Sequence, residues 1–379
     1  MKSSDEVPAD PPLQPMALYR EGQRLHASGD PAAAIHKLNE AIRMMPGLWP
    51  AAMDLGVIMA SMGRPAAAVA QLKSAARMAP GEGVIWFNLG HVLASVARFK
   101  EAAICLKRAV GLEPEKSDYW YNYGCVLRSS GRTGEALDAF EKVLALQPGH
   151  ADAGWMRDVV GGTAREAPPE GFIRNLFDEC AGSFDRQLQG NLQYRTPEGL
   201  ARLYRRWKAS PGPVHRALDL GCGTGLVGAA FSELAETLTG VDLSPGMLEQ
   251  ARKKGLYDTL VESGVSEFLQ REQPGWPLVV AGDVMPYIDD PRLLPGLVFR
   301  RLLVGGVFVF STEEGGSRDQ PWSVNRWGRF VHHGSWLEEA LAQAGYIVEV
   351  RERCNLRLQL DRPVEGSLWL ARRPAGRLR

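Results

Sequence analysis

Along the second half of the chain, short apolar or β-branched runs alternate with longer amphipathic stretches. Five runs, RALDL, TLTGVDL, DTLVE, PLVVAG and GGVFVFS, precede amphipathic stretches at 226–235, 245–254, 265–271, 290–302 and 335–344. Such alternation predicts a mostly parallel sheet with helices on both faces. Two last runs, YIVEVRE and GSLWLAR, follow without a helix between them. We therefore expect an α/β domain whose seven-stranded sheet includes one antiparallel hairpin strand.

The first half of the chain has a different period, because four sets of residues recur every 34 positions. The sets are Gly22, Gly56, Gly90 and Gly124; Ala34, Ala68, Ala102 and Ala136; Ala41, Ala75, Ala109 and Val143; and Pro46, Pro80, Pro114 and Pro148. Small residues let two helix axes approach closely, and proline stops a helix. The period therefore predicts four pairs of antiparallel helices.

This register resembles that of tetratricopeptide repeats over residues 15–150. The four units are 15–48, 49–82, 83–116 and 117–150, and the stretch 151–160 looks like a capping helix. The resemblance implies an all-α solenoid whose first helices line a concave groove. The fifth position of each unit in that groove is Tyr19, Met53, Phe87 and Tyr121. Such a stripe either binds an apolar peptide of a protein partner or packs against the second domain of the same chain.

Composition shifts suggest the remaining boundaries. Residues 1–14 are polar and Pro-rich, so we expect a disordered tail, and they lack the apolar core of a secretory signal. The Gly/Pro-rich stretch 161–170 predicts a linker. A helical lid segment is expected at 171–213, ahead of the α/β domain at 214–379.

Charge and cysteine content narrow the possible partners. The 379 residues include 44 Lys and Arg and 44 Asp and Glu, so no net charge attracts nucleic acid or an anionic membrane. No apolar run approaches the ~20 residues that span a bilayer. The five cysteines lie far apart without a CxxC pair. This spacing argues against a metal site and a disulfide framework, and it favours a reducing cytoplasm.

A glycine-rich turn in RALDLGCGTGLVG, residues 216–228, follows the first predicted strand of the α/β domain and precedes a predicted helix. Glycines at such a turn let the backbone approach a ligand. Gly221, Gly223 and Gly225 have a GxGxG spacing, whereas the dinucleotide fingerprint is GxGxxG. Asp242 ends the second strand 21 residues after Gly221, where a carboxylate can accept hydrogen bonds from both ribose hydroxyls.

In this order and spacing, LDLGCGTG and GVDLSPGMLEQAR resemble the motifs of Rossmann-like class I S-adenosylmethionine-dependent methyltransferases. The resemblance implies S-adenosyl-L-methionine as the cofactor and assigns a part of it to each motif residue. Gly221, Cys222, Gly223 and Gly225 would approach the methionine part, Asp219 the amino group, Asp242 the ribose, and Leu243 or Met247 the adenine. The family's Asp after the third strand is missing in LVESGVSEFL. Ser263, Glu262 or the backbone of Val265 would take its place.

Acceptors in open α/β sheets lie beyond the carboxyl ends of the strands. Strand four ends in AGDVMPYIDD, which puts Asp283 and Tyr287 near the methyl group, Asp283 counting as both a cofactor contact and a catalytic candidate. The segment 312–333 after strand five is rich in Trp, Arg and His, which favours substrate recognition. His332 is its candidate general base, since histidine takes up a proton near pH 7.

Nearly the whole chain resembles a bacterial family of predicted methyltransferases that carry tetratricopeptide repeats. By that resemblance the segment before the first strand covers the cofactor through Phe177, Phe184, Tyr194 and Arg195. Strand four has no NPPY-like or DPPY-like tetrapeptide, which argues against an exocyclic or amide nitrogen acceptor. Three functions stay open: a methyltransferase whose repeats recruit a protein or carrier-bound acceptor, a small-molecule O- or C-methyltransferase whose repeats serve packing or assembly, and a non-catalytic assembly factor that binds the cofactor.

Overall fold

The chain forms two compact units in this computed structural model, residues 1–161 and 162–379. The described residues are 13–164, 166–182, 184–186, 188, 190, 192–208, 212–271, 275–288, 290–325, 327–359 and 362–375. The tail expected at 1–14 lies outside these residues except for its last two.

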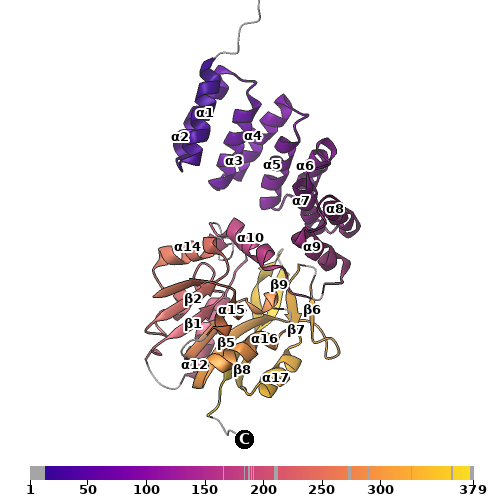
Figure 1. Ribbon diagram of the computed structural model, residues 1–379. Coiled ribbons are helices and arrows are strands. Elements are labelled where there is room, and N and C mark those ends of the chain that lie inside the picture. The colour runs from indigo at the N-terminus through magenta and orange to yellow at the C-terminus, as the bar shows by residue number, and fades with distance from the viewer. Residues whose placement is uncertain are drawn as a thin grey trace, which may run out of the picture. The chain divides into compact units, whose positions relative to one another are not determined.

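The first unit is a row of paired antiparallel helices (Figure 1). The four pairs are α1 (Leu13–Ala27) with α2 (Pro31–Met44), α3 (Trp49–Ser61) with α4 (Pro65–Met78), α5 (Gly83–Ser95) with α6 (Phe99–Leu112), and α7 (Ser117–Ser129) with α8 (Thr133–Leu146). A ninth helix, α9 (Ala151–Gly161), packs on α8. The second helix of each pair ends two residues before one of the periodic prolines, as the 34-residue period predicts.

In three of the four pairs the two helices approach so closely that a Cβ on the periodic glycine would clash. A Cβ on Gly56 would lie 2.7 Å from Cγ of Leu72, and one on Gly90 would lie 2.6 Å from Cγ of Leu106. The leucines themselves recur with the 34-residue period and are fully buried. The periodic alanines at 34, 68, 102 and 136 are also fully buried. Glycine, alanine and leucine therefore form one repeated interhelical core.

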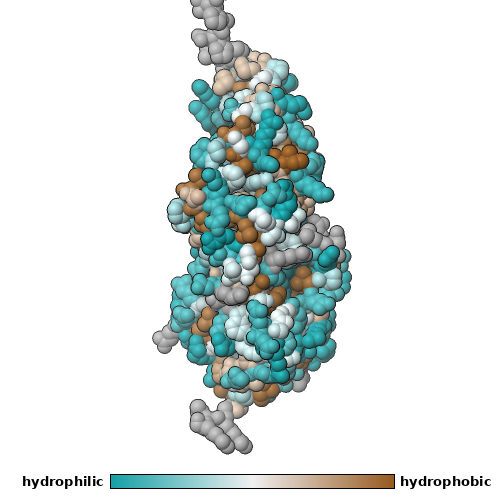
Figure 2. Space-filling model, turned by 90° about the vertical axis from the view of Figure 1, so that its right-hand side faces the viewer, coloured by the Kyte–Doolittle hydropathy of each residue, from teal (hydrophilic) through white to brown (hydrophobic). Residues whose placement is uncertain are grey.

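The surface of the repeats mixes hydrophobic and hydrophilic residues, and the face in Figure 2 shows separate brown groups among teal ones. The predicted groove residues Tyr19, Met53, Phe87 and Tyr121 are all half-buried. Phe87 stacks on Tyr119 with ring centroids 4.6 Å apart, and Tyr121 stacks on His150 at 5.1 Å. Two members of the stripe thus already pack on aromatic neighbours within the unit.

The second unit contains a seven-stranded sheet in the order β3-β2-β1-β4-β5-β9-β8. The strands are β1 (Ala217–Leu220), β2 (Leu238–Asp242), β3 (Thr259–Glu262), β4 (Trp276–Ala281), β5 (Leu302–Glu313), β8 (Ile347–Gln359) and β9 (Arg362–Arg372). The first five strands are parallel, and β9 runs antiparallel to both β5 and β8. This is the mostly parallel sheet with one antiparallel hairpin strand that the sequence predicts.

Helices cover both faces of this sheet because alternate strand residues point to opposite sides (Figure 1). The helices are α10 (Glu170–Cys180), α11 (Phe184–Arg186), α12 (Thr196–Trp207), α13 (Leu226–Phe231), α14 (Pro245–Lys254), α15 (Val265–Gln270), α16 (Leu293–Arg301) and α17 (Gly334–Gln343), with a 3₁₀ turn at Met285–Tyr287. One core packs β-strand residues against α12 and α13, and the other packs them against α15, α16 and α17. The strand ends are thereby fixed between two buried layers.

The segment 312–333 forms a small antiparallel pair, β6 (Trp322–Val324) and β7 (Phe330–His332). The stretch 161–170, predicted as a linker, runs from the last residue of α9 to the first of α10. Among the described residues, no helix combines the length and the apolar character that crossing a membrane requires.

Candidate functional site

The glycine-rich turn after β1 has the backbone shape that glycine permits. Gly221, Gly223 and Gly225 have φ angles of 62°, 54° and 90°, all in the left-handed region. A Cβ built on Gly223 meets no atom within 4 Å, and Gly223 lines a cavity. Gly225 is the N-terminal cap of α13. The turn therefore presents bare backbone to the cavity.

Asp242 ties this turn to the end of β2. Its Oδ2 accepts a hydrogen bond from the backbone N of Gly223 at 2.8 Å, and its Oδ1 accepts one from the backbone N of Ser244 at 2.9 Å. Burial raises the pKa of Asp242, although the backbone donors favour its charged form. A carboxylate has about four lone-pair sites, so Asp242 can still accept a hydrogen bond from a ligand.

Asp219 lies beneath the turn rather than in the cavity wall. It is fully buried, and its Oδ2 accepts a hydrogen bond of 2.6 Å from the hydroxyl of Tyr257. Burial raises the pKa of Asp219 to about 7, although the hydrogen bond from Tyr257 opposes this rise. Its Oδ1 has no hydrogen-bond partner among the described residues. The predicted hydrogen bond from Asp219 to a cofactor amino group, made directly or through water, remains a prediction.

The cavity has a volume of about 550 Å³ and lies at the carboxyl ends of β1, β2 and β4. Most predicted cofactor residues line it: Gly221, Cys222, Gly223, Asp242, Leu243, Met247, Asp283 and Tyr194. Tyr287, a predicted catalytic residue, also lines it. Asp219, Gly225 and Ser263 are not in the lining. The hydroxyl of Ser263 instead donates to Glu267 on α15 at 3.0 Å.

The segment 171–213, predicted to be a lid and called the lid segment below, contributes mostly apolar side chains to the cavity wall. Ile173 and Phe177 come from α10, Phe184 from α11, and Leu188 and Tyr194 from the chain that follows. Phe177 contacts both Phe184 and Tyr287 edge to face, with ring centroids 6.1 and 5.5 Å apart. Arg195 is exposed and does not line the cavity.

Polar contacts fasten the lid segment to the loops around the glycine-rich turn. Asp178 accepts hydrogen bonds from the hydroxyl of Ser244 and from the backbone N of Gly246, at 2.9 Å for the latter. These donors belong to the N-terminus of α14, where a negative charge is favoured. Asp185 accepts a hydrogen bond from Thr224 and forms an ion pair with Lys254 at 2.6 Å. The lid is thereby linked to the same segments that hold Asp242.

A cluster of charged residues forms the polar end of the cavity, and we call Asp283, Glu313, Arg329 and Arg357 the charged cluster. Arg357 on β8 donates to Asp283 Oδ2 at 3.0 Å and also to Glu313. Nε of Arg329 forms an ion pair of 2.6 Å with Glu313, and its Nη2 lies 3.6 Å from Asp283 Oδ2. The two negative charges of the acids therefore offset the two positive charges of the guanidinium groups.

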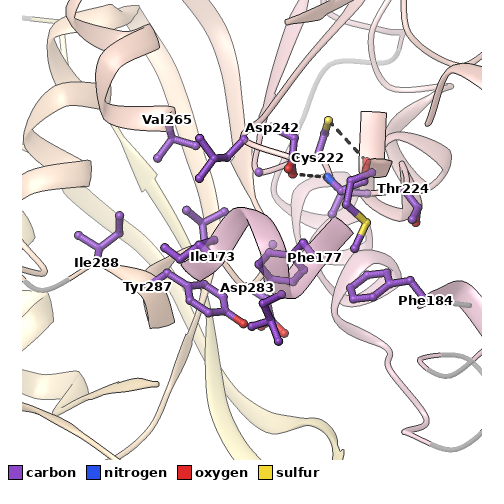
Figure 3. Close-up of a pocket in the computed structure, with 18 of the residues that line it drawn as sticks. Ile173, Phe177, Phe184, Cys222, Thr224, Asp242, Val265, Asp283, Tyr287 and Ile288 are labelled. Carbon is purple, nitrogen blue, oxygen red and sulfur yellow. Dashed lines mark hydrogen bonds between the residues drawn. The ribbon is translucent and has the colours of Figure 1, made fainter. Parts of the chain in front are cut away.

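Tyr287 completes this end of the cavity. Nη1 of Arg329 donates to the Tyr287 hydroxyl at 3.1 Å, and the guanidinium lies 5.2 Å from the centre of the Tyr287 ring. Asp283 has a φ of 58°, unusual for a residue with a Cβ, and its backbone N donates to Ser311 Oγ at 2.9 Å. Figure 3 shows Asp283 and Tyr287 on one side of the cavity, and Asp242 and Cys222 on the other.

His332 does not line the cavity. It is fully buried at the end of β7, and neither ring nitrogen has a hydrogen-bond partner among the described residues. Burial lowers the pKa of His332 to about 4, so the imidazole is neutral near pH 7. Its role as a general base remains a prediction, and the geometry does not bring it together with Asp283 and Tyr287.

Arg357 is a charged residue of the lining that sequence reasoning missed. It lies in the edge strand β8, between Leu356 and Leu358, outside every motif. An arginine within an apolar stretch of a strand is a signal of a buried ion pair. Its partners, however, come from the ends of β4 and β5, which no sequence spacing relates to β8.

Comparison with known proteins agrees with this architecture. Residues 217–300 match the family model described as a methyltransferase domain. Residues 19–83, 84–116 and 117–150 each match models described as tetratricopeptide repeats. The last two ranges coincide, within one residue, with the third and fourth units that the 34-residue period predicts.

Three curated relatives illustrate the similarity. Methyltransferase-like protein 27 of Homo sapiens is 43% identical over 89 residues, which are 23% of this chain and 35% of the relative. Malonyl-[acyl-carrier protein] O-methyltransferase of Pectobacterium atrosepticum is 28% identical over 213 residues, 52% of this chain and 79% of the relative. Nodulation protein S of Rhizobium tropici is 30% identical over 164 residues, 41% of this chain and 63% of the relative. The first match thus spans about a third of its relative, and the last spans less than two thirds.

The match at 217–300 begins with β1 and includes the glycine-rich turn, Asp242 and Asp283. The periodic helix pairs and the mostly parallel sheet are therefore those of a tetratricopeptide-repeat protein that carries a class I methyltransferase domain.

Proposed function

We propose that this protein is an S-adenosylmethionine-dependent methyltransferase whose acceptor is recruited by the repeats. The observation that supports it most is the pairing of the bare backbone at Gly223 with the carboxylate of Asp242, joined by a 2.8 Å hydrogen bond at the cavity wall. S-adenosylmethionine supplies a methyl group on a positively charged sulfur.

The residues around the turn fit this cofactor. Gly223 leaves room for a ligand at the backbone, and the carboxylate of Asp242 suits the two hydroxyls of a ribose. Leu243 and Met247 supply apolar surface for a base, and Gly264 opens the wall beside them. Adenine recognition at this point would rest on backbone and apolar contacts, since Ser263 points to Glu267.

The chain's own part in the reaction is to align two reactants and to exclude water. The lid segment covers the cavity with Phe177 and Phe184, and the charged cluster borders it beside Tyr287. Alignment of two bound reactants can account for about 7–11 kcal/mol of a barrier. No further catalytic group is required for a transfer that depends mainly on position.

Recruitment by the repeats is supported by their type, since repeats of this kind present an extended concave surface to partners. The relative from Pectobacterium is named for an acceptor held on an acyl-carrier protein. Such a carrier, or another protein, suits a surface made of Tyr19, Met53, Phe87 and Tyr121.

Calorimetry tests the cofactor assignment. The whole chain should bind S-adenosylmethionine, and Asp242→Ala should weaken binding by about 10- to 150-fold, the worth of hydrogen bonds to a charged group. Glu179→Ala, at an exposed position on α10, is the matched control. Tighter binding of a nicotinamide dinucleotide, or unchanged affinity in Asp242→Ala, would contradict the assignment.

Methyl-labelled cofactor tests recruitment. A lysate from a strain that lacks the protein is incubated with the whole chain or with a chain that lacks residues 1–160, and labelled proteins are separated from labelled small molecules. We expect a labelled protein or carrier only with the whole chain. Equal labelling by both chains would favour the small-molecule alternative, in which the repeats serve packing or assembly.

A further inference from the structure

We propose that the polar end of the cavity binds a carboxylate on an apolar body, so that the acceptor of the methyl group is a carboxylate oxygen. This inference rests on the proposed function, because it names the acceptor class for the same site. Three observations carry it: the hydrogen-bond donors at this end, the engagement of its acids, and the kinds of residue that line the cavity.

At the polar end, some hydrogen-bond donors have no acceptor among the described residues. The hydroxyl of Tyr287 accepts a hydrogen bond from Nη1 of Arg329 at 3.1 Å, which leaves its own proton to donate. Donation from a guanidinium polarises that hydroxyl and strengthens it as a donor. Nη2 of Arg329 is buried and has no hydrogen-bond partner among the described residues. A ligand oxygen at Tyr287 would therefore lie beside the guanidinium of Arg329, whose Nη2 has an ion pair with Asp283 at 3.6 Å but no hydrogen bond.

The acids at this end are already engaged. Asp283 accepts hydrogen bonds from Arg357 at 3.0 Å and from Ser311 at 3.3 Å, and Glu313 is paired with both arginines. Burial opposes the charge on Arg329, but Tyr287, Glu313 and Asp283 raise its pKa above the ordinary value, so it stays positive. The charged cluster therefore offers a ligand hydrogen-bond donors more readily than a free base.

Outside the charged cluster and Asp242, the described lining offers few groups that could remove a proton from an acceptor, and its remaining carboxylate, Glu170, is exposed to solvent. It contains no histidine and no lysine, and burial raises the pKa of both lining thiols, that of Cys180 to about 11. Burial likewise raises the pKa of Tyr287 and Tyr194. An acceptor that arrives ionised needs no base, and a carboxylate is the common group that does so at neutral pH.

The chemistry balances without a further reactant. One carboxylate oxygen forms a bond to the methyl carbon, the carbon–sulfur bond breaks, and its electron pair stays on sulfur. A negative and a positive charge are both neutralised, and no proton is released. Neutralisation of opposite charges is favoured where water is excluded, and Phe177 and Phe184 provide that apolar surrounding beside Tyr287.

Binding measurements on the whole chain, saturated with S-adenosylhomocysteine, test the inference without turnover. The probes are octanoate, octan-1-ol, octylamine, and the mono-thioester of octanedioate with N-acetylcysteamine, which carries the same carboxylate on a carrier-like thioester. We expect octanoate or the thioester to bind at least about tenfold more tightly than the alcohol and the amine. Whichever of the two binds more tightly indicates whether the acid is free or carrier-bound. Equal binding of octan-1-ol and both carboxylates would overturn the inference.

Two variants locate the site. Arg329→Gln should remove the advantage of the carboxylate by about tenfold or more, and Tyr287→Phe by about three- to tenfold. Arg318→Gln, an exposed arginine that pairs with Glu339 on α17, is the control and should change nothing. Because Arg329→Gln leaves Glu313 with one partner fewer, it could fail to fold, and Tyr287→Phe then decides alone.

The failure of the inference is distinct from failure of the proposed function. If wild-type protein binds S-adenosylhomocysteine but Tyr287→Phe keeps the full preference for carboxylates, the acceptor inference is wrong and the cofactor assignment stands. If wild-type protein does not bind S-adenosylhomocysteine, the proposed function itself is wrong.

Discussion

Glycine has opposite uses in the two units of this protein. In the repeats, Gly56 and Gly90 have helical backbones, and they are glycine because a Cβ would strike Leu72 or Leu106. In the α/β unit, Gly223 has open space around its missing Cβ and is glycine because its φ is 54°. The first use builds a core, whereas the second exposes backbone to a cavity. One residue type thus marks packing in one unit and a binding site in the other.

The ion pairs of the two units also differ, in sequence separation and in burial. Ion pairs in the repeats, such as Arg98 with Glu101 and Arg132 with Glu135, are local and exposed, so each is worth little. Those of the charged cluster join Glu313 at the end of β5 to Arg329, just before β7, and to Arg357 on β8, and their side chains are largely buried. We therefore expect changes of pH and of buried groups to act on the α/β unit, and changes of helix contact to act on the repeats.

The largest expected effect concerns pH and His332. The folded state keeps this histidine neutral down to about pH 4, whereas an unfolded chain protonates it near pH 6.5. Between these values the unfolded state binds more protons, so the free energy of unfolding falls as the pH drops. The wild type should lose about 3 kcal/mol relative to His332→Phe between pH 7 and 4.

Denaturant titration of both proteins at several pH values measures this difference. Asp219 acts with the opposite sign, because its raised pKa stabilises the folded state as the pH falls from about 7. It is present in both proteins and cancels in the comparison. Parallel curves for the two proteins would show that His332 is not a buried neutral group.

The next effect concerns the packing glycines of the repeats. Gly90→Ala places a Cβ 2.6 Å from Leu106 and should cost about 1–2 kcal/mol of unfolding free energy, as overpacking does. Gly111→Ala, in the next helix with no atom within 4 Å, should be neutral or stabilising by up to about 1 kcal/mol. Circular dichroism during urea unfolding compares them. If both variants lost the same free energy of unfolding, the loss would reflect helix propensity and not the packing contact.

A third test compares two glycines with a positive φ, one in each unit. Gly223→Ala and Gly29→Ala should each lose about 1 kcal/mol of stability, since alanine is strained at φ of 54° or 85°. Only Gly223→Ala should also weaken S-adenosylhomocysteine binding, by about tenfold, because its methyl group enters the cavity wall. Calorimetry at equal folded fraction separates the two effects. Normal binding by Gly223→Ala would remove this turn from the cofactor site.

The smallest effect concerns the fastening of the lid segment. Asp178→Ala removes the acceptor for Ser244 and Gly246 at the start of α14, which should cost about 1 kcal/mol, as the loss of a helix cap does. Cofactor affinity should fall about fivefold, because the same segment follows Asp242. Glu179→Ala at the adjacent exposed position should bind normally. If both variants bind alike, the lid does not support the cofactor segment through this contact.

The sequence by itself determined both fold classes and most of the cavity wall. A 34-residue period specifies helix pairs because each unit contacts only its neighbours, so the residues that pack together lie close in the sequence. The order of strand, glycine turn, helix and acid-ended strand likewise lies within 30 residues. Gly221, Gly223 and Asp242 could therefore be placed around one cavity from their spacing alone.

The sequence placed Asp283 and Tyr287 at this cavity, but only the tertiary structure showed which charged residues pair with them. Asp283 follows β4, Glu313 ends β5, Arg329 precedes β7 and Arg357 lies within β8, so these residues are brought together by the neighbouring positions of their strands. The tertiary structure also decided that Asp219 and His332 are fully buried and do not line the cavity. A strand residue can face either side of a sheet or a cavity, and burial selects the side only when all neighbouring elements are in place.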